Sequence, residues 1–151
     1  MLLKADSSVA CWEDVEGWTP LHIATSLKPP HCLQVVNAIL GSYHEAAEVH
    51  HEVTGECVLH LLTKHQITSY EEGVSLLNIQ EVYAVRNCKN NLRDTPLHHA
   101  VVNDDRIMVR VLLGFYPKLD IKNKNGVTAA SLVQQLCGVP LDLVSSPFIL
   151  R

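Results

Sequence analysis

The sequence lacks the features that define several large classes of protein. No apolar run approaches ~20 residues, so we expect no transmembrane helix. Acidic residues outnumber basic ones by 16 to 12, and the formal net charge of −4 gives no electrostatic reason to bind nucleic acid or an anionic membrane. A charge at Lys4 comes before any apolar core, so we expect no secretory signal peptide at this end.

Sequence motifs for catalysis are missing as well. The chain has neither a Gly-rich phosphate loop nor a nucleophile elbow. Cys57 and His60 are three residues apart at a predicted helix start and would share a face, as a nucleophile and a base do. However, no third group is identifiable, and burial makes a thiol inert. The sequence therefore predicts a protein without catalytic residues and without a cofactor.

The cysteines are odd in number and widely spaced. The five are Cys11, Cys32, Cys57, Cys88 and Cys137. This pattern favours buried free thiols over a disulfide framework, and it indicates a reducing compartment, the cytoplasm or the nucleus.

Side chains of metal-binding types are concentrated in one region of the sequence. They are His44, His50, His51, Cys57, His60 and His65. Their spacings match no common zinc pattern, and Cys57 and His60 have structural roles at a predicted helix start. We therefore predict no metal site.

The most regular part of the chain is the stretch 94–132. Thr95 followed by Pro96 predicts a helix start, because a threonine hydroxyl accepts from the free N–H groups of the first turn and proline there loses no needed donor. Apolar residues at helical spacing follow, and the run 103–105 interrupts them. A second helix is expected through 107–113, with Gly114 as its left-handed cap.

The same pattern returns along the chain at a nearly fixed period. Helix starts with a histidine in register occur at Thr19-Pro-Leu-His22, Cys57-Val-Leu-His60 and Thr95-Pro-Leu-His98, and Thr128-Ala-Ala is a partial fourth copy. Thr95 and Thr128 are 33 residues apart, whereas Thr19 to Cys57 and Cys57 to Thr95 are each 38. A period of ~33 residues with a T-P-L-H motif is typical of one family of repeats.

The first copy carries that resemblance most completely. Asp14-Val-Glu-Gly-Trp-Thr-Pro-Leu-His-Ile-Ala24 fits the pattern D-x-x-G-x-T-P-L-H-x-A at every specified position. The chain resembles the ankyrin-repeat family over roughly residues 14–138. The resemblance implies an all-α solenoid of stacked helix-turn-helix units with β-hairpin-like loops, in which each histidine bridges neighbouring turns.

The repeats divide the chain into five expected segments. Residues 1–13 are a partial preceding repeat or an N-terminal cap, and they suggest a fragment of a longer array. Residues 14–51 form a full repeat, 52–87 a degenerate one, 88–122 a regular one, and 123–151 a partial repeat with a C-terminal cap.

Some details of the repeats are less regular. We expect the first inner helix to stop at the prolines of 28–30, and its outer helix to end at Gly41. Gly73 is expected to weaken the second outer helix by about 1 kcal/mol relative to alanine. The segments 42–51 and 78–87 are expected to be long loops, and the residues after Gly138 either a partial second helix or an apolar tail over the open end of the stack.

The resemblance also implies where a partner protein would bind, since this family uses its hairpin tips and the exposed face of its inner helices. Carried onto this sequence, the tip residues are Glu16, Trp18, Thr54, Glu56, Leu92, Asp94, Lys124 and Asn125. The inner-helix residues are Ile23, Ser26, Leu27, Lys64, His65, His99 and Asn103. Trp18 is the expected anchor, because exposed tryptophan is a typical interface residue; the alternative is that it packs across the neighbouring hairpin.

Two functions follow from the resemblance. The first is a monomeric, non-catalytic protein-interaction module, alone or within a larger scaffold. The second rests on a weaker resemblance of Gly55-Glu-Cys-Val-Leu-His-Leu61 and of the step into Thr95 to the inhibitor-of-κB-like ankyrin proteins. It would be a masking protein for Rel-type transcription factors, although the acidic tail of that group is missing.

Overall fold

A computed structural model describes residues 12–27, 31–64 and 67–138. The expectations for residues 1–11 and for the tail after Gly138 lie outside these ranges. The expectation that the first inner helix stops at 28–30 is wrong, because that helix ends at Ala24 with Thr25 as its C-cap. The described helices are α1 (Pro20–Ala24), α2 (His31–Ser42), the 3-10 helix η3 (His44–Glu48), α3 (Val58–Leu62), α4 (Tyr70–Leu77), α5 (Gln80–Ala84), α6 (Pro96–Val102), α7 (Arg106–Gly114) and α8 (Ala129–Cys137).

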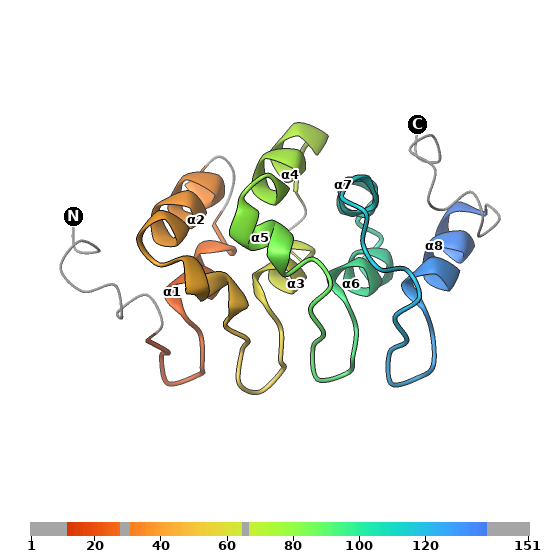
Figure 1. Ribbon diagram of the computed structural model, residues 1–151, viewed down its shortest axis with the longest axis horizontal. Coiled ribbons are helices and arrows are strands. Elements are labelled where there is room, and N and C mark those ends of the chain that lie inside the picture. Colours follow the sequence, from red (N-terminus) through yellow and green to blue (C-terminus); the bar gives the residue numbers. More distant parts are fainter. Residues whose placement is uncertain (1–11, 28–30, 65–66, 139–151) are drawn as a thin grey trace.

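The helices lie in two rows along the long axis of the molecule (Figure 1). The inner row holds α1, α3, α6 and α8, and the outer row holds α2, α4 and α7. A loop precedes each inner helix, and the loops project on the side away from the outer row. The described part of the chain forms no strand, only an isolated antiparallel bridge between Lys122 and Thr128. None of its helices has the length and apolar character needed to cross a bilayer.

The inner helices begin where the sequence motif predicts. Thr19 precedes α1 and accepts a hydrogen bond from the His22 N–H, and Thr128 precedes α8 and accepts one from the Ser131 N–H. At α6, Thr95 and His98 cap the first turn together, and Pro96 occupies the first helical position. These local bonds satisfy backbone donors that a helix start leaves free.

The core lies between the two rows of helices and between successive inner helices. Equivalent leucines of three inner helices, Leu21, Leu59 and Leu97, are fully buried, and in α8 Ala129, at the place of the motif's proline, is also fully buried. The helices touch in the order α1 to α3, α3 to α6 and α6 to α8. Burying one such leucine stabilises the fold by roughly 1.5–3 kcal/mol, and this surface is covered only when neighbouring units stack.

Two outer helices approach each other closely at Gly73. A Cβ atom added at Gly73 of α4 would lie 2.7 Å from Cγ2 of Val111 on α7. The expectation that this glycine only weakens its helix is therefore incomplete, because the missing side chain makes room for the neighbouring helix.

Gly73→Ala is expected to lower the free energy of unfolding by about 1–3 kcal/mol, since overpacking outweighs the gain in helix propensity. Urea denaturation measures the change. The matched control is Gly41→Ala in α2, where no atom lies within 4 Å of the added Cβ and where we expect a gain of about 0.5–1 kcal/mol. A Val111→Ala second change should relieve part of the Gly73→Ala loss, and strict additivity of the two would contradict the steric explanation.

Several loop and cap predictions are wrong in detail. The segments 42–51 and 78–87 are not irregular throughout, because they contain η3 and α5, which contact each other. Helix α2 runs through Gly41 to Ser42. Gly114 is the last residue of α7, and the left-handed residue after that helix is Tyr116, with a φ of 52°.

The cysteine prediction is wrong for one pair. The sulfur atoms of Cys57 and Cys88 are joined as a disulfide, whereas Cys32 and Cys137 are free. The segment through α5 brings Cys88 back beside α3, a contact that spacing in the sequence does not reveal. Cys57 and Cys88 therefore no longer support the inference of a reducing compartment, and the location of the protein stays a prediction.

Candidate functional site

The projecting loops are tight turns of nearly the same construction. In three of them an Asp or Asn side chain accepts two backbone N–H bonds at 2.9–3.0 Å and closes the turn; these residues are Asp14, Asn90 and Asn123. A residue with positive φ precedes the helix start in each: Gly17, Gly126 and, in place of glycine, Arg93 at 61°. The second loop uses His51, whose Nδ1 accepts the Thr54 N–H at 3.2 Å.

Hydrogen bonds connect each loop to the next. His51 Nε2 donates to the Glu16 carbonyl at 2.9 Å, the Asn91 N–H donates to the Thr54 carbonyl at 3.0 Å, and the Lys124 N–H donates to the Leu92 carbonyl at 2.9 Å. The tips are therefore held in fixed relative positions, as a binding surface requires.

The motif histidines have the predicted bridging role at two of three positions. His60 and His98 accept the N–H of the helix-capping residue on Nδ1, at 3.2 Å each, and donate from Nε2 to the Asp94 and Val127 carbonyls at 2.9 and 3.1 Å. His22 makes the first bond, to the Thr19 N–H at 3.3 Å, but its Nε2 does not bond the carbonyl that precedes the next helix cap; its interaction is instead with the backbone of Val49. His51 supplies that link instead.

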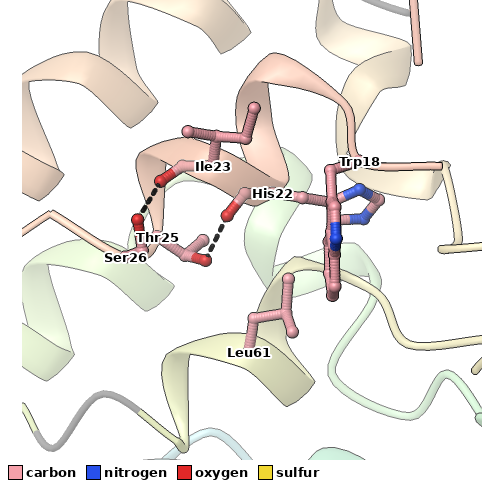
Figure 2. Close-up of a pocket in the computed structure, with 6 residues that line it drawn as sticks. All are labelled: Trp18, His22, Ile23, Thr25, Ser26 and Leu61. Carbon is pink, nitrogen blue, oxygen red and sulfur yellow. Dashed lines mark hydrogen bonds between the residues drawn. The ribbon is translucent and has the colours of Figure 1, made fainter. Parts of the chain in front are cut away.

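An apolar hollow opens beside the first inner helix (Figure 2). Its volume is about 250 Å³, and its lining is Trp18, His22, Ile23, Thr25, Ser26 and Leu61. The Thr25 hydroxyl donates to the His22 carbonyl at 2.6 Å and the Ser26 hydroxyl to the Ile23 carbonyl at 2.7 Å, so both hydroxyls are satisfied by carbonyls of α1. Ile23 is 50% exposed and Leu27 is 41% exposed. Two large aliphatic side chains are thus left open to a partner.

Trp18 is half-buried and is not a free anchor. Its ring stacks on the His51 ring with 3.9 Å between centroids. The expectation of an exposed indole is wrong, and the alternative, packing across the neighbouring loop, is correct. Trp18 still lines the hollow, so its contribution to binding stays a prediction.

Glu56 is also buried, contrary to its predicted place at a tip. It is 4% exposed, and its carboxylate accepts from Lys64 Nζ at 2.7–2.8 Å. Burial acts to raise the pKa of Glu56, but the Lys64 ammonium outweighs it and the pKa lies below its ordinary value. His99 Nε2 lies 3.6 Å from the same carboxylate and accepts from Asn90 Nδ2 at 3.2 Å. Glu56 is therefore held by neighbouring polar groups, and its contact with a partner stays a prediction.

The remaining predicted contact residues divide by exposure. The exposed ones are Glu16, Ile23, Ser26, Leu27, Lys64, Leu92, Asn103, Lys124 and Asn125. Thr54, Asp94 and His99 are half-buried. His65 lies outside the described residues.

Sequence reasoning missed two apolar tip residues. Val15 is fully exposed and Val53 is 73% exposed, next to the predicted Glu16 and Thr54. An apolar side chain inside an otherwise polar turn was the available signal. With Leu92, 59% exposed, each of the first three loops presents one aliphatic side chain.

Possible metal ligands gather at one place in the described residues. They are Cys57, His60 and Cys88, with ligand atoms all within 4.8 Å of one another. Two other histidines of the region noted in the sequence have separate partners: His44 pairs with Glu81 at 2.7 Å, and His50 bonds the Gly55 carbonyl at 2.7 Å.

Comparison with known proteins identifies one of these units. Residues 92–121 match the family model of the ankyrin repeat, about a fifth of the chain. This stretch covers the third loop tip, α6, α7 and the segment after them. No curated protein matches the chain.

Proposed function

We propose, from the premise that residues 92–121 are an ankyrin repeat, that the chain is an array of such repeats that binds a partner protein and performs no catalysis. The repeats would span 14–51, 52–87, 88–122 and the start of 123–151. Ankyrin repeats generally serve as interaction modules. The turn geometry shared by the first, third and fourth loops, and the order of helix contacts, support extension of the repeat beyond the matched residues.

The observation that carries the proposal is the exposed aliphatic surface beside the first inner helix. Ile23 is open on α1 and lines the hollow, Leu27 is open in the turn that follows α1, and Val53 and Leu92 are open on following loops. Exposed aliphatic side chains that adjoin a hollow on a rigid surface typically mark an interaction site. The occupant we infer is a protein segment with aliphatic side chains that fill the hollow.

The test is an affinity capture followed by a measurement with the purified partner. The Ile23→Glu, Leu27→Glu double variant is expected to raise the dissociation constant at least about 30-fold, since two central contacts of roughly 1 kcal/mol or more each are lost. Both side chains are exposed, so the variant should keep its helical circular dichroism and its melting temperature.

The matched control is Tyr116→Asn, which removes an 82% exposed side chain from the loop after α7. Asparagine tolerates the positive φ of that position, and we expect unchanged affinity. Equal binding by the double variant and the control would place the site elsewhere, and failure to capture any protein would count against the module itself. A Rel-type dimer belongs among the purified candidates, because nanomolar binding to it would favour the masking function suggested by the sequence.

A further inference from the structure

Cys57, His60 and Cys88 bring two sulfur atoms and one imidazole nitrogen together where the start of α3 meets the segment after α5. His60 Nδ1 lies 3.2 Å from the Cys57 sulfur and 3.6 Å from the Cys88 sulfur. We propose that, when the disulfide between the two cysteines is reduced, these three side chains bind a zinc ion. The site is separate from the proposed protein-binding surface and does not depend on it.

The hydrogen bonds of His60 leave the correct nitrogen for a metal. Its Nε2 lies 2.9 Å from the Asp94 carbonyl oxygen, which only accepts, so Nε2 carries the hydrogen and Nδ1 carries the lone pair. Metal-bound histidines usually donate their second nitrogen to a carbonyl in this way, which fixes the ring. The Nδ1 lone pair accepts the Cys57 N–H at 3.2 Å, a long bond that zinc would replace.

The distances suit a tetrahedral zinc ion. Zinc–sulfur bonds of ~2.3 Å and zinc–nitrogen bonds of ~2.0 Å place sulfur and nitrogen ligands ~3.5 Å apart and two sulfurs ~3.8 Å apart. The observed sulfur–nitrogen distances of 3.2 and 3.6 Å agree. The Cα atoms of Cys57 and Cys88 are 7.1 Å apart, beyond the usual ~4.4–6.8 Å of a disulfide. This backbone spacing leaves room for the sulfurs to separate around an ion.

Burial and access also suit a metal site. Cys57 and His60 are fully buried, whereas Cys88 is half-buried and gives the ion a route from solvent. Among the described residues no other Cys, His, Asp or Glu joins this group, so water fills the fourth position. Cys57 stands where the repeat motif has threonine, so the helix cap itself has no need of sulfur.

Reduction must come first. A phosphine or a dithiol supplies two electrons, and with two protons the disulfide becomes two thiols. Zinc binding then displaces those two protons as both sulfurs become thiolates.

The test uses the full chain reduced with a phosphine, and cobalt(II) alone as the probe. Cobalt in this site should give one equivalent of a thiolate-to-cobalt absorption band with intense tetrahedral d–d bands, and zinc should abolish both. Cys57→Thr restores the threonine of the motif, so it should fold, yet it should lose the bands. Loss of an outer-shell partner already costs 10–100-fold in metal affinity, so we expect zinc binding at least about 100-fold weaker in this variant.

Two further variants separate the site from general thiol binding. Cys88→Ser should behave like Cys57→Thr, and Cys137→Ser, which changes a free cysteine elsewhere, should bind like the unmodified chain. Zinc at a hundred times its dissociation constant should raise the melting temperature by roughly 5–10 °C in the unmodified chain and leave Cys57→Thr unchanged. The proposal is overturned if the fully reduced chain shows no cobalt band, if Cys57→Thr binds as tightly, or if Cys137→Ser also loses the site; the pair would then serve only as a disulfide.

Discussion

Replacing Gly55 with alanine is expected to lower the free energy of unfolding by roughly 3–4 kcal/mol, from backbone strain and overpacking together. Gly55 has a φ of 69°, which a residue with a Cβ adopts at a cost. The added Cβ would also lie 2.5 Å from Asn91 Oδ1 and 2.7 Å from the Asn91 backbone nitrogen. That nitrogen donates to the Thr54 carbonyl, and Asn91 Nδ2 donates to the Val53 carbonyl, so relief of the clash breaks the bonds between two loops.

Gly126 provides the matched control for this prediction. Its φ is 76°, but no atom lies within 4 Å of an added Cβ. Gly126→Ala should therefore cost only the strain, about 1–2 kcal/mol. Urea denaturation of both variants gives the difference. Equal losses at the two positions would show that contact with Asn91 contributes nothing.

Acidification from pH 7.5 to pH 5 is expected to remove about 2 kcal/mol of stability through His60 alone. Burial lowers the pKa of His60 from 6.5 to about 4, although its bond to the Asp94 carbonyl opposes the shift. Between these pH values the unfolded chain binds a proton that the folded chain does not. The contribution of neutral His60 to the free energy of unfolding is therefore fully present above pH 6.5 and is lost as the pH falls toward 4.

Other groups modify this loss in known directions. Burial also lowers the pKa of His22 and of His99, so both add to it. Burial raises the pKa of Asp105, so on acidification this carboxylate is protonated in the folded chain at a higher pH than in the unfolded chain. This protonation stabilises the folded chain and offsets part of the loss. Glu56, with its lowered pKa, adds a further loss at still lower pH.

Urea denaturation at the two pH values, with a chelator present, measures the total. His99→Gln should show a smaller loss than the unmodified chain, and the His60 ring should remain neutral in NMR titration until the pH approaches 4. Stability that does not change over this range, or a His60 ring that protonates near pH 6.5, would contradict the prediction.

The inner helices were predictable because their signals are local. Thr19, Thr95 and Thr128 each cap a helix within three residues, and a histidine at fixed spacing follows the first two. The five-residue helices η3 and α5 were not predictable. Such short helices are marginal by themselves and depend on tertiary contacts that the sequence does not display.

The candidate site was predictable only in part. The exposure of Ile23 on α1 follows from helical spacing, and Leu27, in the turn after this helix, is also exposed as expected. The burial of Trp18 and Glu56 depends on contacts with His51 and Lys64, which lie in other segments. It could therefore not be predicted from the positions of these residues in their loops. The contact of Cys57 with Cys88 likewise depends on the path of the chain through α5.

The two lengthened repeats have a consequence for how this chain can change by insertion and deletion. Helix η3 in the first and helix α5 in the second contact each other, and Ala46 and Ala47 of η3 and Val82 of α5 are buried. Deleting one segment alone to restore the regular period would expose the apolar side of the other. The two inserted segments therefore depend on each other structurally. Loss of both at once should be tolerated more readily than loss of either one. A protein descended from this one should carry both segments or neither.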